Sequence, residues 1–219
     1  MPLKKIVNYL VRQIDGSLSI PKPQIIFSIT GGSENFKIDK DEENLLKSEL
    51  MKIAKISNTW LISSGIDSDV IRIIGEAADE DENSHNLTLL GITCRNRVYG
   101  RYSKLRRDGD EIFDEKNIEN LNPYQSCFLF FDASNYEAEI EFRTKFENHL
   151  NQLFKIPFFV MAFNGGIGTL KKILNALEGN VPIIMIAVCY HKIFLLKKRF
   201  YTKFYTDFTC KHQSIKNTC

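Results

Sequence analysis

Three glycine-rich corners of this sequence carry residue types that can hold a phosphate group. They read SITGGSENF at 28–36, SSGIDSDV at 63–70 and FNGGIGTL at 163–170. Glycine lets the backbone take positive φ angles and approach a ligand closely, and a helix that follows such a turn adds free amide groups and a partial positive charge. Serine and threonine hydroxyls add further donors. The three corners together therefore indicate a phosphate cradle.

Each corner alone has a structural explanation, because tight strand-to-helix turns use glycine and serine for steric reasons. Three such corners at corresponding strand ends favour a binding site. None is a P-loop, since no Lys-Ser or Lys-Thr pair follows the glycines at the required spacing, and none is a complete GxGxxG motif. The pattern predicts binding of a nucleotide or sugar phosphate without identifying the ligand.

The corners are positioned by an alternation of short apolar runs and longer amphipathic ones. The apolar runs, typical of strands buried on both faces, are 24–29, 59–63, 87–92, 126–132, 157–163 and 182–188. Segments with helical spacing lie between them, at 41–57, 68–79, 136–153 and 168–179. This alternation predicts an α/β fold with a Rossmann-like, doubly wound, mainly parallel sheet. In such a sheet, ligands bind beyond the carboxyl ends of the strands.

Length and composition set the limits of this expectation. A chain of 219 residues, 43% hydrophobic, can bury a proper core. We expect an N-terminal extension at 1–20, the α/β domain at 21–189 and a basic, aromatic tail at 190–219. The tail is either a helix packed on the domain or sequence that the fold does not need. Residues 93–125 interrupt the alternation and read as a long polar insertion.

Several functional classes are disfavoured. The five cysteines are odd in number, widely spaced and include no CxxC pair, which argues against a disulfide framework and fits a reducing, cytoplasmic location. Neither Cys189-x-His191 nor Cys210-x-His212 has the spacing of a usual zinc-ligand pair, so no metal site is expected. The longest apolar run, 181–190, is too short to cross a bilayer. A net charge of only +2 makes the basic segment 95–107 a solvated loop in preference to a nucleic-acid interface.

Two basic side chains are open to more than one interpretation. Arg143 lies four residues after Glu139 in the helix expected at 136–153, which suits a surface ion pair. Arg143 can equally clamp a phosphate group with two hydrogen bonds. Arg97, two residues before Tyr99, lies in the polar insertion, where a solvated loop and contacts with phosphates and stacked bases are the alternatives.

The order of these motifs resembles the N-terminal SLOG domain of the melastatin-type (TRPM) transient receptor potential cation channels. The elements TGG, GEA, EIEFR and GGxGTL occur in that family's order, and the similarity is collinear over about residues 20–188. It implies a Rossmann-like module on the cytosolic side of a homo-tetrameric, calcium-permeable channel, in contact with other channel domains or subunits. Some members bind ADP-ribose or another adenine nucleotide; no cofactor is required.

The resemblance places the ligand on twelve residues of this sequence. These are Thr30, Gly31, Gly32, Ser64, Gly65, Arg97, Tyr99, Arg143, Gly165, Gly166, Gly168 and Thr169. One further glycine-rich corner of the family, approximately EGSGR, is missing, because the chain continues as CYHKIFLLKKRF after 182–188. The pore segments of a channel are also absent from the sequence. We therefore expect either a fragment of a channel or a free-standing relative.

The third corner also resembles the PGGxGTxxE motif of LOG-type phosphoribohydrolases, in which the glutamate is catalytic. Here Asn164 replaces the proline and Lys172 stands in the place of the glutamate. Because a lysine cannot supply the carboxylate, we expect no enzymatic activity. A phosphoribohydrolase would need a carboxylate from elsewhere, such as Glu139 or Glu141. A purely structural domain without a ligand is the third alternative.

Overall fold

The structure is a computed structural model that describes residues 3–11, 20–32, 36, 38–81, 86–98, 120–132 and 136–186. Its strands are β1 (Ile25–Gly31), β2 (Thr59–Ser63), β3 (Leu87–Cys94), β4 (Cys127–Phe131), β5 (Phe158–Phe163) and β6 (Ile183–Ile186). Its helices are α1 (Leu3–Val11), α2 (Lys40–Ile56), α3 (Asp69–Glu80), α4 (Tyr136–Phe154) and α5 (Ile167–Glu178), with a 3-10 turn, η2, at Arg95–Arg97.

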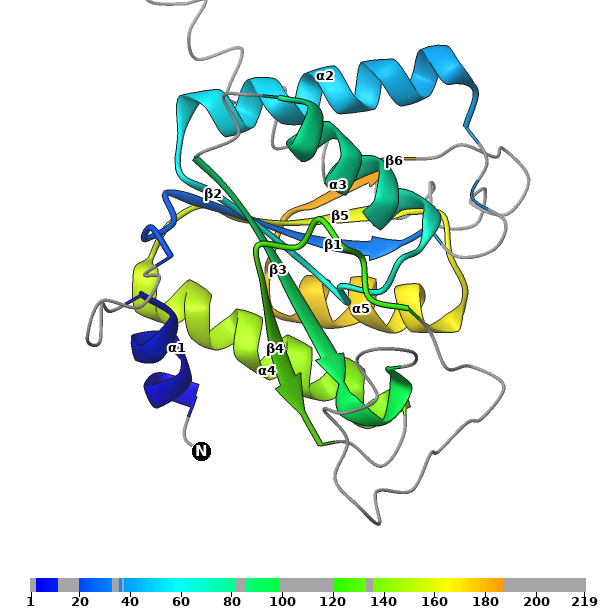
Figure 1. The fold of residues 1–219 in the computed structure, drawn as a ribbon. Helices are drawn as coiled ribbons and strands as arrows, with labels where there is room; N and C mark the ends of the chain where they lie inside the picture. The colour runs from blue at the N-terminus through cyan, green and yellow to red at the C-terminus, as the bar shows by residue number, and fades with distance from the viewer. Residues whose placement is uncertain are drawn as a thin grey trace, which may run out of the picture. The chain divides into compact units, whose positions relative to one another are not determined.

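The six strands form one sheet in the order β4-β3-β2-β1-β5-β6. Every neighbouring pair in that sheet is parallel. Helices α2 and α3 cover one face, and α1, α4 and α5 lie on the other (Figure 1). The predicted doubly wound α/β fold is therefore confirmed.

The order of the strands creates a switch point at the centre of the sheet. From β1 the chain builds outward through β2, β3 and β4, and it then returns through α4 to place β5 on the other side of β1. At the carboxyl ends of β1 and β5 the loops diverge, which is where open α/β sheets bind ligands.

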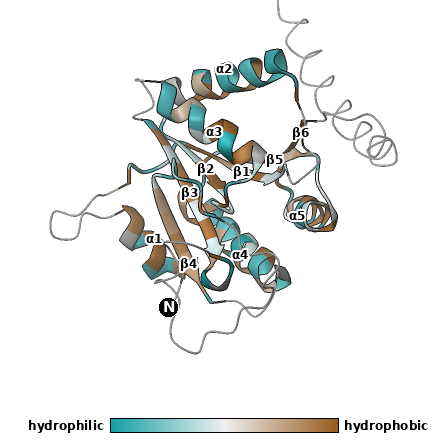
Figure 2. Cartoon of the chain, turned by 45° about the vertical axis from the view of Figure 1, so that its right-hand side comes forward, coloured by the Kyte–Doolittle hydropathy of each residue, from teal (hydrophilic) through white to brown (hydrophobic). Residues whose placement is uncertain are grey.

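Burial explains why these segments are strands. All eight residues of β3 and all five of β2 are buried, as the continuous apolar runs predict. Hydrophobic residues are concentrated in the strands, whereas α2 and α4 carry much of the hydrophilic surface (Figure 2). Trp60 in β2 is fully buried and still satisfies its polar group, because its Nε1–H donates to the carbonyl of Pro21 at 2.9 Å.

Local signals fix the helix ends. Asp39 caps α2 through a capping box: its carboxylate accepts from the amide of Glu42 at 2.8 Å, and its own amide donates to the Glu42 side chain at 3.2 Å. Helix α5 stops at Gly179, whose amide donates to the carbonyl of Asn175 at 3.0 Å. The predicted bounds of the helices agree with the observed ones to within one residue.

Two features differ from the sequence expectation. Helix α1 lies inside the expected extension at 1–20, and its residues Ile6 and Val7 are buried. It is only 9 residues long, too short for periodicity to identify securely, and packing supports it. Strand β3 and η2 also extend the ordered elements into the expected insertion at 93–125, as far as Arg97.

Other expectations lie outside what the structure describes. Tyr99 and residues 187–219 are among them, so the tail at 190–219 and the domain boundaries remain predictions. No helix among the described residues is long and apolar enough to cross a membrane.

Gly31 allows β1 and β5 to approach at the switch point. Its φ angle is +92°, and a Cβ atom there would lie 2.0 Å from the carbonyl oxygen of Phe163. A side chain at this position would strain the backbone and push the strand ends apart. The expectation of positive φ at the corners is borne out at Gly31, Gly32, Gly65 and Gly165.

We predict that Gly31→Ala lowers the free energy of unfolding by roughly 1–3 kcal/mol, through backbone strain and overpacking. Chemical denaturation followed by the fluorescence of Trp60, the single tryptophan of the chain, measures it. Gly166→Ala is the matched control, because Gly166 has φ −98° and a Cβ there would meet nothing within 4 Å. Its cost is expected to stay below about 1 kcal/mol. Equal losses in the two variants would contradict the prediction.

Candidate functional site

A cavity of about 90 Å³ lies between the corners and receives one residue from each of them. Thr30 belongs to the first corner, Ser64 to the second and Gly168 to the third. The cavity is further lined by Arg97, Glu139, Ile140, Arg143 and Lys172. Arg97 and Arg143, which the sequence singled out, therefore line the same cavity as residues of all three corners.

The remaining predicted site residues lie around the cavity without lining it. Gly31, Gly32, Gly65, Gly165 and Gly166 belong to the three turns, and Thr169 is buried, with its hydroxyl near the position that a Cβ on Gly165 would occupy. Tyr99 falls outside the described residues. The glycines therefore shape the turns, and the ligand-facing groups are the hydroxyls and the basic side chains.

Two backbone amides expected to serve a ligand are already used within the protein. The amide of Gly32 donates to the carbonyl of Phe163 at 2.7 Å, and the amide of Gly65 donates to Oγ of Ser63 at 2.9 Å. Gly32 thus donates to the neighbouring strand β5 and Gly65 donates within its own turn, so both amides are already paired. That Gly32 and Gly65 contact a ligand stays a prediction.

The third corner differs from the other two at its helix. Helix α5 begins at Ile167 after the N-cap residue Gly166, a glycine that has no side chain to cap it, and no described side chain caps it either. The amides of a first helical turn have no partner inside the helix, and they carry a partial positive charge. Since Gly168 of this turn lines the cavity, the cavity lies against an open helix N-terminus.

Arg143 connects α4 to the centre of the sheet. Its Nη2 donates to the carbonyls of Ile29 and Ile62 at 2.5 and 2.8 Å, and to Oγ of Ser28 at 2.9 Å. Its Nε donates to Glu147 at 2.8 Å. Arg143 is only 9% exposed, and this network fixes its guanidinium beside the ends of β1 and β2.

The Arg143–Glu139 surface pair that the helical spacing suggested does not form. Arg143 pairs instead with Glu147, one turn further along α4, and Glu139 accepts from Nη1 of Arg97 through both oxygens at 2.8 Å. Glu139 is 4% exposed, so neither residue belongs to the surface. Glu141, the other carboxylate considered, is exposed and pairs with Lys145.

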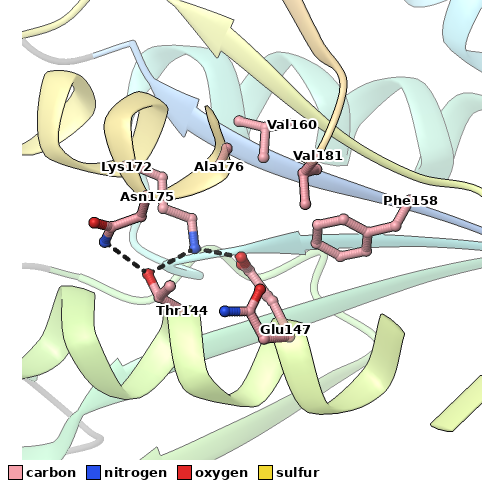
Figure 3. Close-up of a pocket in the computed structure, with 9 residues that line it drawn as sticks. Thr144, Glu147, Phe158, Val160, Lys172, Asn175, Ala176 and Val181 are labelled. Carbon is pink, nitrogen blue, oxygen red and sulfur yellow. Dashed lines mark hydrogen bonds and ion pairs between the residues drawn. The ribbon is translucent and has the colours of Figure 1, made fainter. Parts of the chain in front are cut away.

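Lys172 reaches from α5 to α4 and ends between two polar side chains (Figure 3). Its ammonium donates to a carboxylate oxygen of Glu147 and, at 3.3 Å, to Oγ1 of Thr144. Asn175 also donates to this hydroxyl, at 3.4 Å. Lys172 lines the main cavity and also a smaller space of about 10 Å³ on its other side.

Arg143, Glu147 and Lys172 form a buried charged cluster, in which burial and neighbouring charges shift the pKa values of Glu147 and Lys172. Burial alone raises the pKa of Glu147, but Lys172 and Arg143 outweigh it and hold the pKa below its usual value. Burial lowers the pKa of Lys172, Glu147 raises it and Arg143 lowers it again, with a result of about 8. The single carboxylate of Glu147 therefore serves two buried cations.

Sequence reasoning missed Glu147 and Ser28, which complete the cluster. The Arg143–Glu147 spacing of four residues was as visible as the Arg143–Glu139 spacing, and only the packing of α4 decides between them. Ser28 lies within an apolar strand, where a buried hydroxyl needs a hydrogen-bonding partner; it donates to Glu147 at 2.7 Å.

The arrangement is suited to an anion. Hydroxyls, basic side chains and an open helix N-terminus face a small, partly open cavity, and each favours a negatively charged oxygen. Within the part of the chain that the structure describes, no group of three or more His, Cys, Asp or Glu side chains is placed to hold a metal ion.

Comparison with known proteins gives a consistent result. Residues 3–191 match a family model described as SLOG in TRPM. Over 187 residues the chain is 26% identical to transient receptor potential cation channel subfamily M member 2 of Rattus norvegicus, covering 75% of this chain and 12% of that protein. Over 184 residues it is 23% identical to subfamily M member 7 of Homo sapiens, covering 76% and 10%. The chain thus spans about a tenth of the length of these relatives.

We predict that Arg143→Leu lowers the free energy of unfolding by roughly 3–5 kcal/mol, because it removes four buried hydrogen bonds and leaves the carbonyls of Ile29 and Ile62 without this donor. Lys145→Ala is the control on the same helix, since the Lys145–Glu141 pair is about two-thirds exposed. Its effect should stay within about 0.5 kcal/mol. Denaturant titration compares the two variants, and a similar loss in both would show that the Arg143 network does not stabilise the fold.

Proposed function

Because the chain belongs to the family of SLOG domains found in TRPM channels, we propose that it is a non-catalytic module that binds an adenine nucleotide such as ADP-ribose. The observation that carries this function is the cavity at the switch point. One residue of each glycine corner faces it, together with Arg143 and the open N-terminus of α5. These are the donor types that phosphate groups require.

The size of the cavity limits which part of the ligand it can take. A cavity of about 90 Å³ has room for several ordered waters, each needing roughly 10–15 Å³. Pockets that enclose a whole small molecule are usually about 300–1,000 Å³. The cavity therefore suits a phosphoryl group, with the nucleoside part of the ligand lying beyond its mouth.

We extend the function to a channel context. The relatives named above are channel proteins about ten times as long as the matched region, so this domain would act as one cytosolic part of a homo-tetrameric, calcium-permeable channel. Helix α5 supports an assembly role, because it exposes apolar side chains at one helical face, namely Ile167, Leu170, Leu174 and Leu177.

Calorimetry with the full chain tests nucleotide binding. We predict that ADP-ribose or AMP binds with measurable heat and raises the melting temperature, since a ligand that binds only the folded state stabilises it. If neither ligand gives heat or a thermal shift, nucleotide binding is excluded, and a purely structural domain is the remaining interpretation.

A double variant makes this test specific to the cavity. Thr30→Val with Ser64→Ala removes two hydroxyls that line the cavity and should weaken binding roughly tenfold, at about 0.5–1.5 kcal/mol for each hydrogen bond. Lys145→Ala removes an exposed cation outside the cavity and should leave the affinity unchanged. Equal losses in both variants would place the ligand elsewhere on the protein.

We propose the absence of catalysis from two residues that line the cavity, Lys172 and Glu139. At the position of the catalytic glutamate of the similar motif stands Lys172, and Glu139, which lines the cavity, is held through both oxygens by Arg97. A carboxylate bound in this way is poorly placed to act as a base.

Incubation of AMP with the protein should therefore release no free adenine above the rate in buffer, as measured by liquid chromatography. Glu139→Gln is the informative variant, because it removes the only carboxylate among the described lining residues of this cavity. Adenine release by the wild-type chain that disappears in Glu139→Gln would establish a phosphoribohydrolase instead.

A further inference from the structure

Lys172 lies at the boundary between the two cavities, where its charge is poorly compensated. Lys172 is 4% exposed, and its carboxylate partner Glu147 is 2% exposed. Glu147 also accepts from Nε of Arg143 and from the hydroxyl of Ser28. One carboxylate is thus shared by two buried cations, and Glu139, the carboxylate that lines the main cavity among the described residues, is engaged by Arg97. A net positive charge remains buried in the Arg143–Glu147–Lys172 cluster, and an anion in the cavity would compensate it.

The two cations differ in how freely they can respond to an anion. Arg143 is fixed by two backbone carbonyls, by Ser28 and by Glu147, so its guanidinium cannot turn without breaking several bonds. Among the residues that the structure describes, the partners of Lys172 are two side chains, those of Glu147 and Thr144. An ammonium has three donors on a flexible four-carbon stem, and here two donors have described acceptors. The third can serve a ligand in the cavity that Lys172 lines.

We propose that Lys172 is the specificity-determining residue of this cavity: it selects a phosphoryl group by contributing its ammonium to the bound anion while Arg143 stays fixed. This inference rests on the proposed function and deepens it. The residue that occupies the place of a catalytic acid would act as the ligand-responsive cation. Neutral ligands of similar shape would not engage it, because they leave the buried charge uncompensated.

The charges around Lys172 give this proposal a pH signature. Burial and Arg143 lower the pKa of Lys172 to about 8, against the opposing effect of Glu147. The other charged groups that line the main cavity are Glu139 and Arg97, which pair with each other. A bound phosphate adds negative charge near the ammonium and raises its pKa in the complex. Binding therefore takes up a proton where the free protein has lost it, and affinity falls as the pH rises above about 8.

Calorimetric titrations of the full chain with AMP and ADP-ribose at pH 7, 8 and 9 test this directly, with adenosine as the uncharged probe. Each titration is done in two buffers of different ionisation enthalpy, so that proton uptake is measured. The AMP phosphate stays dianionic over this range, since its second pKa is about 6. For the wild-type chain we expect an affinity about tenfold weaker at pH 9 than at pH 7, with proton uptake rising towards one. Adenosine should bind weakly, with no such pH dependence.

Two variants separate charge from packing. Lys172→Met keeps the apolar stem and should bind both nucleotides at least tenfold more weakly at pH 7, without proton uptake. Lys172→Arg stays charged at every pH tested and should lose the pH dependence while retaining binding. Melting temperatures establish that each variant is folded, and the wild-type pH series decides the question even if neither variant folds.

The outcomes for the two levels of interpretation are distinct. Wild-type binding that is unchanged between pH 7 and 9, with no proton uptake, overturns the role of Lys172 and leaves nucleotide binding standing. Equal affinity of Lys172→Met and the wild type for the nucleotides also overturns the role of Lys172 and leaves nucleotide binding standing. Absence of binding by either nucleotide at any pH overturns the proposed function, and the role of Lys172 with it.

Discussion

The interaction on which the centre of this structure depends is the buried contact of Arg143 with Glu147 and with the ends of β1 and β2. One guanidinium joins α4 to the carbonyls of Ile29 and Ile62, in neighbouring strands, and to Ser28. Without this guanidinium, buried oxygens of two strands and of Ser28 would lose their donor in a region of low dielectric. The network therefore sets where α4 lies on the sheet, and with it the position of Glu139 in the cavity wall.

The same contact explains why the cavity favours an anion. Holding Arg143 at the switch point requires a counter-ion, and Glu147 supplies it from one turn further along α4. Lys172 of α5 then shares that carboxylate, so the cluster carries more positive than negative charge. At Gly31 the backbones of β1 and β5 lie so close that a Cβ would meet the carbonyl of Phe163. This close approach brings the first and third corners together around the charge. The Arg143 network thus both positions α4 on the sheet and contributes to the positive charge of the cavity.

Much of the fold could be predicted from the sequence, because apolar runs and helical spacing report burial directly. The six strands and four of the helices follow from that pattern, whereas α1 is too short to be recognised without its packing against the rest of the domain. The convergence of Thr30, Ser64 and Gly168 on one cavity also follows from parallel strand ends. The partners of Arg143 could not be predicted, since Glu139 and Glu147 are equally spaced from it and tertiary packing alone selects Glu147. Similarly, the sequence could not reveal that the amide of Gly32 pairs with Phe163 of β5, or that the amide of Gly65 pairs with Ser63 within its own turn.

The central claim is that the cluster buries a positive charge that the protein itself does not fully compensate. Its most direct test is the free energy of unfolding of the wild-type chain and of Lys172→Met between pH 7 and 10.5. The pKa of Lys172 is lowered in the folded state, from 10.5 to about 8, so between these values the unfolded chain binds more protons than the folded one. The wild type should therefore gain up to about 3 kcal/mol relative to Lys172→Met as the pH rises through this window, with no relative change below pH 7.5. A difference between the two proteins that stays constant or shrinks with rising pH would contradict the claim.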